Sequence, residues 1–418
     1  MNILVLGGGG REHAIAWALA KSPRTDNLYA APGNGGTDSV AQNVAGLNAE
    51  DGQAVLEFVK GNAIDLVVIG PEAPLVAGVA DVLREAGVAV FGPDAQGAQL
   101  EGSKTYSKEF MQANGIPTAR YGSFTELEPA LAYVHELGAP VVVKADGLAA
   151  GKGVVVADTI EVAEDAVRSC FDGAFGQAGS TVVIEECLTG PECSLLAFVS
   201  GGKAHCMATA QDHKRAFDGD RGPNTGGMGA YSPLPFITEE DEREAVERIM
   251  RPVAEAMVAE GSPFEGVLYG GLMKTAGGIK VIEFNARFGD PETEVVLPRL
   301  KSDIVDIFCA VADGRDARIE WDDVPALGIV LASKGYPGSY EKGYEIRGLD
   351  RVEGTVYHMG TKADGDRIVT AGGRVLFVVG RGATLAEARA AALRDVERIE
   401  CDNLFHRTDI GHWALENE

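Results

Sequence analysis

The chain has 418 residues, of which 37 are Lys or Arg and 62 are Asp or Glu, so its formal charge is −25 at pH 7. This length predicts about two to four domains that bury a core without disulfide or metal support. The acidity and the lack of a basic run argue against nucleic-acid and membrane partners. The six cysteines form no CxxC pair and no apolar run is long enough to span a membrane. We therefore expect a cytoplasmic protein with reduced thiols.

The N-terminal residues alternate between strand and helix patterns. Strands are expected at 3–6, 65–69 and 88–91, and helices at 12–21 and 76–86. Such alternation predicts an open parallel sheet with a ligand crevice at the carboxyl ends of its strands. We place this α/β domain at residues 1–100.

The middle and the C-terminal parts have different patterns. Residues 101–325 combine strands with later helices, which favours an α+β unit. The strands expected there cover 141–144, 154–157, 181–186, 194–199, 266–274 and 280–284, and the helices cover 106–114 and 239–260. Short strands from 327 to 379, followed by an alanine-rich helix at 384–400, predict a small mixed domain at 326–418.

A cluster of four glycines, 7–10, follows the first strand. It does not fit the G-x-G-x-x-G dinucleotide fingerprint, because Glu12 or His13 occupies the place of the last glycine. What remains is a helix N-terminus with free N–H groups beside Arg11, which suits a phosphate. The alternative is a tight glycine turn without a ligand.

A second glycine cluster ends in Gly151-Lys152-Gly153 and has Lys144 on the preceding strand. It is not a Walker A loop, because only three residues separate its glycines and a strand follows instead of a helix. A glycine loop between two strands suits a mobile lid over phosphates. A plain glycine hairpin is the alternative, but it does not explain a lysine on each side.

Within residues 281–292, charged and amide side chains occupy every second position from 283 to 287. With a side-chain period of two, Glu283, Asn285 and Arg287 share one strand face, while Ile282 and Phe284 point to the core. Two oxygen ligands beside a cation suit Mg²⁺ and a transferring phosphoryl group. A solvated strand face is the alternative. The charged segment 211–215, which leads into 222–229, is equally well explained as a surface loop.

Dispersed motifs make the chain resemble one family. They are GGGGREH at 7–13, GPEAPL at 70–75, KADGLAAGKGV at 144–154, EECL at 185–188 followed by Glu192, QDHKR at 211–215, PNTGGMGAY at 223–231, EFNARFGDPE at 283–292 and SKGYPG at 333–338. Together they resemble the phosphoribosylamine–glycine ligase family of ATP-grasp enzymes, from residue 1 to residue 411. The resemblance implies an ATP-grasp domain at 101–325 with a mobile lid at about 120–190.

The resemblance also implies an activity and a set of site residues. It implies that glycine and 5-phosphoribosylamine are joined, with ATP and Mg²⁺ or Mn²⁺, through glycyl phosphate to glycinamide ribonucleotide in purine biosynthesis. The implied ATP site contains Lys104, Lys144, Gly151, Lys152, Gly153, Glu185, Leu188 and Glu192, with Glu185 and Leu188 at the adenine edge and Glu192 at the ribose. The implied substrate site contains Gly9, Gly10, Arg11, Glu12, Pro71, Glu72, Asn224 and Gly226. The implied catalytic residues are Asp212, Lys214 and Arg287, and the implied metal ligands are Glu283 and Asn285.

One departure and two alternatives remain at this point. Many ATP-grasp enzymes supply a metal carboxylate from the strand before the Glu283 strand, but residues 267–273 contain no acid. The ligands of a second metal are therefore undetermined. One alternative function is another ATP-grasp reaction, that of a carboxylase or a formyltransferase. The other is a regulatory nucleotide-binding protein without turnover, which predicts loss of metal or phosphate residues that are all present here.

Overall fold

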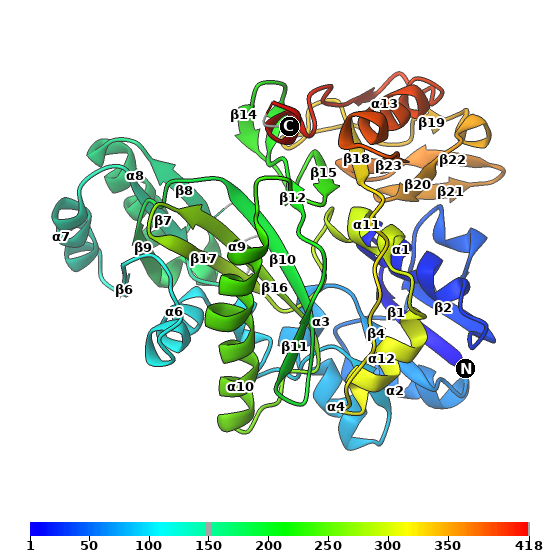
Figure 1. Ribbon diagram of the computed structural model, residues 1–418, viewed down its shortest axis with the longest axis horizontal. Coiled ribbons are helices and arrows are strands. Elements are labelled where there is room, and N and C mark those ends of the chain that lie inside the picture. Colours follow the sequence, from blue (N-terminus) through cyan, green and yellow to red (C-terminus); the bar gives the residue numbers. More distant parts are fainter. Residues whose placement is uncertain (148–152, 417–418) are drawn as a thin grey trace.

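A computed structural model describes residues 1–147 and 153–416, and Figure 1 shows the arrangement of its sheets. Gly151 and Lys152, which belong to the expected lid loop, lie outside the described residues. The elements before residue 92 form a sheet of five parallel strands in the order β3-β2-β1-β4-β5. Its strands are β1 Asn2–Gly7, β2 Asn27–Pro32, β3 Gln42–Asn43, β4 Leu66–Ile69 and β5 Ala89–Phe91. The expected parallel N-terminal sheet is confirmed.

Short helices accompany this N-terminal sheet. They are α1 Gly10–Ala20, α2 Gly52–Gly61, α3 Glu72–Val76 and α4 Val79–Glu85. The single helix expected at 76–86 is wrong in extent, because Gly78 adopts φ 77° and separates α3 from α4. Strand β1 lies between β2 and β4, so the loops after β1 and β4 emerge side by side. This is the edge at which ligands bind in parallel sheets.

A small antiparallel sheet with its own core follows. Helices α5 Gln99–Gly102 and α6 Lys104–Ala113 lead to β6 Tyr121–Phe124, β7 Val141–Ala145, β8 Val154–Ala157 and β9 Val182–Glu186, in the order β6-β9-β7-β8. Helices α7 Leu127–Leu137 and α8 Ile160–Phe171 pack on this small sheet at the far left of Figure 1. Its buried apolar residues form a cluster separate from the main core. The small sheet and its two helices therefore form a subdomain with its own hydrophobic core.

The central sheet carries the longest strands of the middle region. Its order is β11-β10-β16-β17, with β10 Glu192–Ser200, β11 Lys203–Cys206, β16 Gly266–Thr275 and β17 Gly278–Asn285. The helix expected at 239–260 is confirmed as α9 Glu239–Ala245, a π turn and α10 Arg251–Ala259. Helices α11 Thr293–Val296 and α12 Ile304–Ala312 follow. Phe91 of the N-terminal sheet stacks on Phe308 of α12 at 3.8 Å between ring centroids, which joins the two sheets.

The C-terminal sheet joins segments that are far apart in the sequence. Its order is β12-β15-β18-β23-β20, where β12 Gln211–Asp212 and β15 Gly229–Ser232 precede β18 Ala326–Ser333, β20 Thr355–His358 and β23 Arg374–Arg381. Helix α13 Leu385–Val396 packs on it, and β24 Leu404–Phe405 pairs with β18. The remaining elements are β13 Arg215–Phe217, β14 Arg221–Asn224, β19 Glu345–Ile346, β21 Thr361–Asp364, β22 Arg367–Thr370 and α14 His412–Leu415. Within the described residues, we find no helix with the length and apolar character of a membrane span.

Candidate active site

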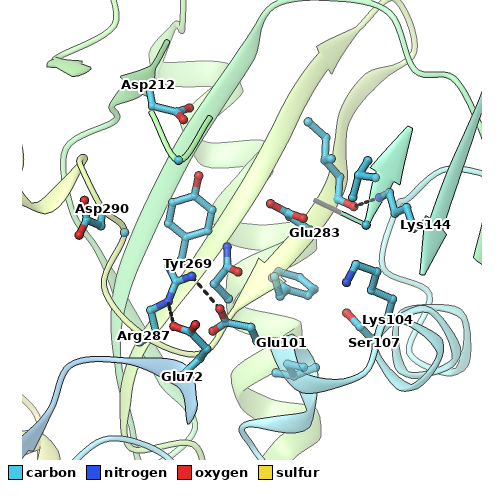
Figure 2. Close-up of a pocket in the computed structure, with 18 of the residues that line it drawn as sticks. Glu72, Glu101, Lys104, Ser107, Lys144, Asp212, Tyr269, Glu283, Arg287 and Asp290 are labelled. Carbon is cyan, nitrogen blue, oxygen red and sulfur yellow. Dashed lines mark hydrogen bonds and ion pairs between the residues drawn. The ribbon is translucent and has the colours of Figure 1, made fainter. Parts of the chain in front are cut away.

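A cavity of about 410 Å³ lies where the N-terminal, central and small sheets meet the C-terminal sheet. Figure 2 shows that side chains from these different bodies point into it. Twelve of the expected site residues line it, namely Arg11, Glu72, Lys104, Lys144, Gly153, Glu185, Asp212, Lys214, Gly226, Glu283, Asn285 and Arg287. The fold therefore brings together residues that the sequence places up to several hundred positions apart.

Strand β17 presents Glu283 and Asn285 to the cavity because of a β-bulge. Glu283 pairs with Gly271 of β16, but the next pair is Val281 with Leu272, so Ile282 is an extra residue in β17. A bulge changes the side-chain phase of a strand. Before the bulge, the odd-numbered Ile279 and Val281 are buried, whereas after it the even-numbered Phe284 is buried. The odd-numbered Glu283 and Asn285 therefore face the cavity.

Two sequence expectations for this strand need correction. Ile282 was expected in the core, but as the bulge residue it is only partly buried and lines the cavity. Arg287 was expected on the strand face, but β17 ends at Asn285, so Arg287 reaches the cavity from the loop that follows. Strand periodicity thus selected three residues that do line the cavity, but it did not anticipate the bulge or the end of the strand.

The oxygen atoms of Glu283 and Asn285 are available to a cation. Within residues 1–147 and 153–416, neither side chain takes part in a hydrogen bond or an ion pair. A carboxylate and an amide oxygen are ligands that Mg²⁺ accepts, with phosphate oxygens completing its shell. The pair therefore fits a divalent metal. On β16, Tyr269 pairs with Asn285 and Gly271 with Glu283, so that strand adds no carboxylate.

Two lysines reach the cavity from different elements. Lys104 begins α6, and its Nζ donates to the Gly147 carbonyl at 2.9 Å. Asp146 accepts backbone N–H bonds from Lys104 at 2.5 Å and from Thr105 at 3.2 Å, so it occupies the N-terminus of α6. Lys144, on β7, donates to the Ile282 carbonyl at 3.2 Å. Both ammonium groups thus lie near Glu283, as Figure 2 shows.

The Glu185 side chain is fully engaged by cations. Its carboxylate lies 2.7 Å from the Nζ of Lys108 and 2.8 Å from the Nζ of Lys144, and it is 4% exposed. Burial alone raises the pKa of Glu185, but the two lysines outweigh burial and hold that pKa below its usual value. Each carboxylate oxygen of Glu185 thus faces one ammonium group. Leu188 follows β9, and Glu192 begins β10 beside Asp212 and Lys214 in a small hollow next to the cavity.

Asp212 and Lys214 form an ion pair at the opposite wall. The Lys214 Nζ lies 2.9 Å from Asp212 Oδ2. Nearby, the buried Glu292 carboxylate accepts hydrogen bonds from Tyr269 and Ser194, both at 2.9 Å. Burial, with Asp212 adding to it, raises the pKa of Glu292. Tyr269 and Glu292 were not foreseen as site residues, although the first lies in an expected strand and the second ends the motif at 283–292.

Arg287 is held by two carboxylates. Its Nη2 lies 2.7 Å from Glu101 Oε1, and its Nε lies 3.5 Å from Glu72 Oε2. Glu101 also accepts from the Ala286 N–H at 2.8 Å, so one side chain holds both the guanidinium and the backbone before it. Figure 2 shows this cluster at the edge of the cavity. Glu101 was missed because a single glutamate in the short helix α5 gives no sequence signal.

The glycine cluster after β1 differs from the expected open phosphate site. The Gly9 N–H is not free, because it donates to Glu12 at 2.6 Å. A side-chain carbon on Gly10 would lie 2.5 Å from a carboxylate oxygen of Glu294. Neither Gly9, Gly10 nor Glu12 lines the cavity, whereas Arg11 does. The Gly9 N–H is therefore not free as expected, because the side chain of Glu12 folds back onto it.

The C-terminal sheet contributes an arginine to the cavity. Arg374 on β23 donates to the Gly226 carbonyl at 2.6 Å, and its Nη2 lies 2.9 Å from Asp290 Oδ1. The Gly226 N–H donates to the Tyr336 hydroxyl at 3.1 Å. Of the other substrate residues expected, Pro71 precedes α3 and Asn224 ends the exposed β14, and neither lines the cavity.

Comparison with known proteins identifies the family. Models of phosphoribosylglycinamide synthetase match most of the chain in order, with the N domain at 1–101, the ATP-grasp (A) domain at 102–293 and the C domain at 326–413. The chain belongs to the phosphoribosylamine–glycine ligase family. As a member of this family, it is an ATP-grasp ligase.

Relatives in this family cover the chain from end to end. The phosphoribosylamine–glycine ligase of Halalkalibacterium halodurans is 53% identical over 99% of this chain and 97% of its own length. That of Escherichia coli K12 is 51% identical over the full length of both chains.

Solved structures agree with this assignment. The phosphoribosylamine–glycine ligase of Thermotoga maritima has a TM-score of 0.86 at 35% identity, covering 98% of this chain and all of that one. The biotin carboxylase domain of Hydrogenobacter thermophilus 2-oxoglutarate carboxylase has a TM-score of 0.72 at 16% identity, covering 97% of this chain and 91% of that one. This second similarity concerns the fold alone.

Proposed function

We propose that this protein uses ATP to join glycine to 5-phosphoribosylamine, giving glycinamide ribonucleotide, ADP and phosphate in purine biosynthesis. The names of its relatives support this activity. The observation that carries the proposal is the single cavity that connects Lys104, Lys144 and Glu283 with Arg11 and Glu72 at the ligand edge of the N-terminal sheet. Nucleotide and sugar phosphate would then meet within one enclosed space.

We propose a distribution of roles along the cavity. Lys104 and Lys144 hold the ATP phosphates, and Gly151, Lys152 and Gly153 are assigned to the same phosphates by the family motif. The backbone of Glu185 and Leu188 holds adenine, and Glu192 holds the ribose. Mg²⁺ or Mn²⁺ held by Glu283 and Asn285 would offset the charge of the phosphates. Arg11 and Glu72 hold phosphoribosylamine, with Gly226 and Asn224 on the side of the C-terminal sheet.

The chemistry begins with the glycine carboxylate. One carboxylate oxygen attacks the γ-phosphorus, ADP leaves, and glycyl phosphate forms. Arg287 neutralises charge on the transferring phosphoryl group. We propose that Asp212 and Glu292 accept hydrogen bonds from the glycine ammonium group while Lys214 keeps Asp212 in place.

The second step is displacement of phosphate by an amine. The amine of phosphoribosylamine is uncharged at working pH, so its lone pair attacks the glycyl carbonyl and phosphate leaves. No dedicated general base is needed, because positioning supplies most of the rate.

We also propose a domain division and a location. The division is 1–100, 101–325 with a lid at about 120–190, and 326–418. It is supported by the separate apolar cluster of the small sheet. A cytoplasmic location suits the six cysteines, all of which are free thiols.

Oxygen labelling tests this function. Glycine with both carboxylate oxygens replaced by ¹⁸O should give inorganic phosphate with one labelled oxygen per turnover, because the bridging oxygen leaves with phosphate. Bicarbonate and formate in place of glycine should give no comparable ADP release. Unlabelled phosphate would contradict the glycyl phosphate step, and ADP release with bicarbonate but not with glycine would contradict the whole proposal.

A further inference from the structure

Lys108 is a buried lysine at the edge of the cavity that has no role in the proposed reaction. Its side chain is 2% exposed, although lysine is almost never buried without a partner. Its Nζ lies 2.7 Å from Glu185 Oε2 and donates to Thr118 Oγ1 at 2.8 Å. Thr118 in turn donates to the Val281 carbonyl at 2.8 Å. Lys108 is thus linked both to the small sheet and to the strand that bears Glu283.

The Lys108, Glu185 and Lys144 side chains form one buried charge cluster across two bodies. Lys108 belongs to α6, whereas Glu185 and Lys144 belong to the adjacent strands β9 and β7 of the small sheet. All three side chains are at most 5% exposed. Two cations surround one anion, so the cluster carries a net charge of about +1 when both lysines are protonated.

This net charge depends on Lys108. Without it, the Glu185 carboxylate would be paired with Lys144 alone, and the pair would be neutral as a whole. Glu185 would also lose its ionic contact with Lys108 of α6. The pair would then attract phosphate less, since Lys108 would no longer offset the Glu185 carboxylate that lies 2.8 Å from Lys144.

We propose that Lys108 is a positioning residue for the nucleotide: it offsets the Glu185 carboxylate, so that the cluster presents a net positive charge to the phosphates through Lys144 and the small sheet stays anchored on α6. The proposal rests on the ATP site of the proposed function. It assigns the Glu185 side chain to holding Lys108 and Lys144 and leaves adenine to the backbone.

The environment of Lys108 gives this role a pH signature. Burial lowers the pKa of Lys108 to about 8, Glu185 opposes this shift and Lys144 adds to it. The charged and titratable groups that face it are Glu185 from β9, Lys144 from β7, Glu283 from β17 and the Tyr121 ring from β6 at 5.8 Å. As pH rises through about 8, Lys108 loses its proton and nucleotide affinity should fall.

Direct binding measurements test the proposal. We would measure ADP and a non-hydrolysable ATP analogue by calorimetry on the full chain, with Lys108→Met, Lys108→Arg and, as a control, Lys60→Met at an exposed lysine of α2. Lys108→Met should weaken binding about tenfold or more, because a buried carboxylate loses a partner. Lys60→Met should bind normally. Lys108→Arg should bind well and should lose the fall in affinity near pH 8, because arginine stays protonated.

A double variant separates charge from packing. If Lys108 acts by neutralising Glu185, then Lys108→Met combined with Glu185→Gln should recover most of the affinity that Lys108→Met loses. A purely structural role predicts that the losses add. Normal binding by Lys108→Met, additive losses in the double variant, or an unchanged pH profile in Lys108→Arg would each overturn the proposal. Nucleotide binding does not require glycine turnover, so failure here is distinguishable from failure of the proposed ligation.

Discussion

The Glu101 carboxylate offers a strong test of how the Arg287 guanidinium is oriented. Glu101 lies on α5, between the N-terminal sheet and α6, and its side chain is 7% exposed. It accepts from the Ala286 N–H at 2.8 Å and pairs with Arg287 at 2.7 Å. The variant Glu101→Gln keeps the size of the side chain and an oxygen for Ala286, but it removes the charge that opposes Arg287.

The expected effect follows from burial and from distance. Removing one partner of a buried ion pair costs about 3–5 kcal/mol of interaction free energy. The glutamine amide keeps one hydrogen bond, so the loss should lie near the lower end of this range. Glu72 is a weak replacement, since it lies 3.5 Å from the Arg287 Nε and is 33% exposed. A guanidinium displaced by about 1 Å slows catalysis on the order of 100-fold. We therefore expect kcat to fall about 30- to 100-fold, equivalent to about 2–3 kcal/mol.

The assay is glycine-dependent ADP release at saturating ATP, together with urea unfolding. Glu109→Gln, at an exposed position of α6, is the matched control and should retain normal kcat and stability. Nucleotide affinity of Glu101→Gln should change little, because Glu101 does not contact Lys104 or Lys144 through a hydrogen bond in the described residues. An unchanged kcat in Glu101→Gln would refute the idea that Glu101 orients Arg287.

Three further predictions concern the metal ligand, the core and pH. Glu283→Gln should lower glycine-dependent ADP release by about a thousandfold or more while circular dichroism stays normal, and near-normal turnover would contradict the metal assignment. Phe308→Ala should cost about 3–5 kcal/mol of unfolding free energy in urea, because its ring stacks on Phe91 between two sheets, and a loss below 1 kcal/mol would argue against that contact. Burial lowers the pKa of His13 to about 3 and that of His358 to about 4, from 6.5. The unfolded chain therefore binds more protons, so stability is complete above pH 6.5 and falls as pH drops toward 4. His358→Gln should flatten that fall in acid titrations of stability, and an unchanged slope would contradict it.

Much of the site follows from local sequence patterns. Parallel strands that end in glycine or in Gly70-Pro71-Glu72 predicted the ligand edge of the N-terminal sheet, because strand periodicity and turn residues are local properties. Arg11 and Glu72 at this edge do line the cavity. Local patterns also identified Glu283 and Asn285 as neighbours on one strand face.

Other features depend on how distant segments pack. The Gly9 N–H that was expected to be free donates instead to Glu12, and a sequence pattern does not show which acceptor an N–H chooses. The phase of β17 is set by the bulge at Ile282, which exists only through pairing with β16. Glu101 contacts Arg287, which lies 186 residues away along the chain. Lys108 contacts Glu185, which lies 77 residues away.

The sequence by itself determined the parallel N-terminal sheet, the family resemblance and the identity of most groups that face the cavity. These features depend on residue type, periodicity and short spacings, all of which can be read from the amino-acid sequence. Only the tertiary structure decided which charges are paired. Arg374 reaches Asp290 because β23 lies next to β18 in the C-terminal sheet, and Lys144 shares Glu185 with Lys108 because the small sheet packs against α6. Pairing depends on distances of a few ångströms between segments far apart in the chain, and those distances are set by the packing of sheets rather than by any local pattern.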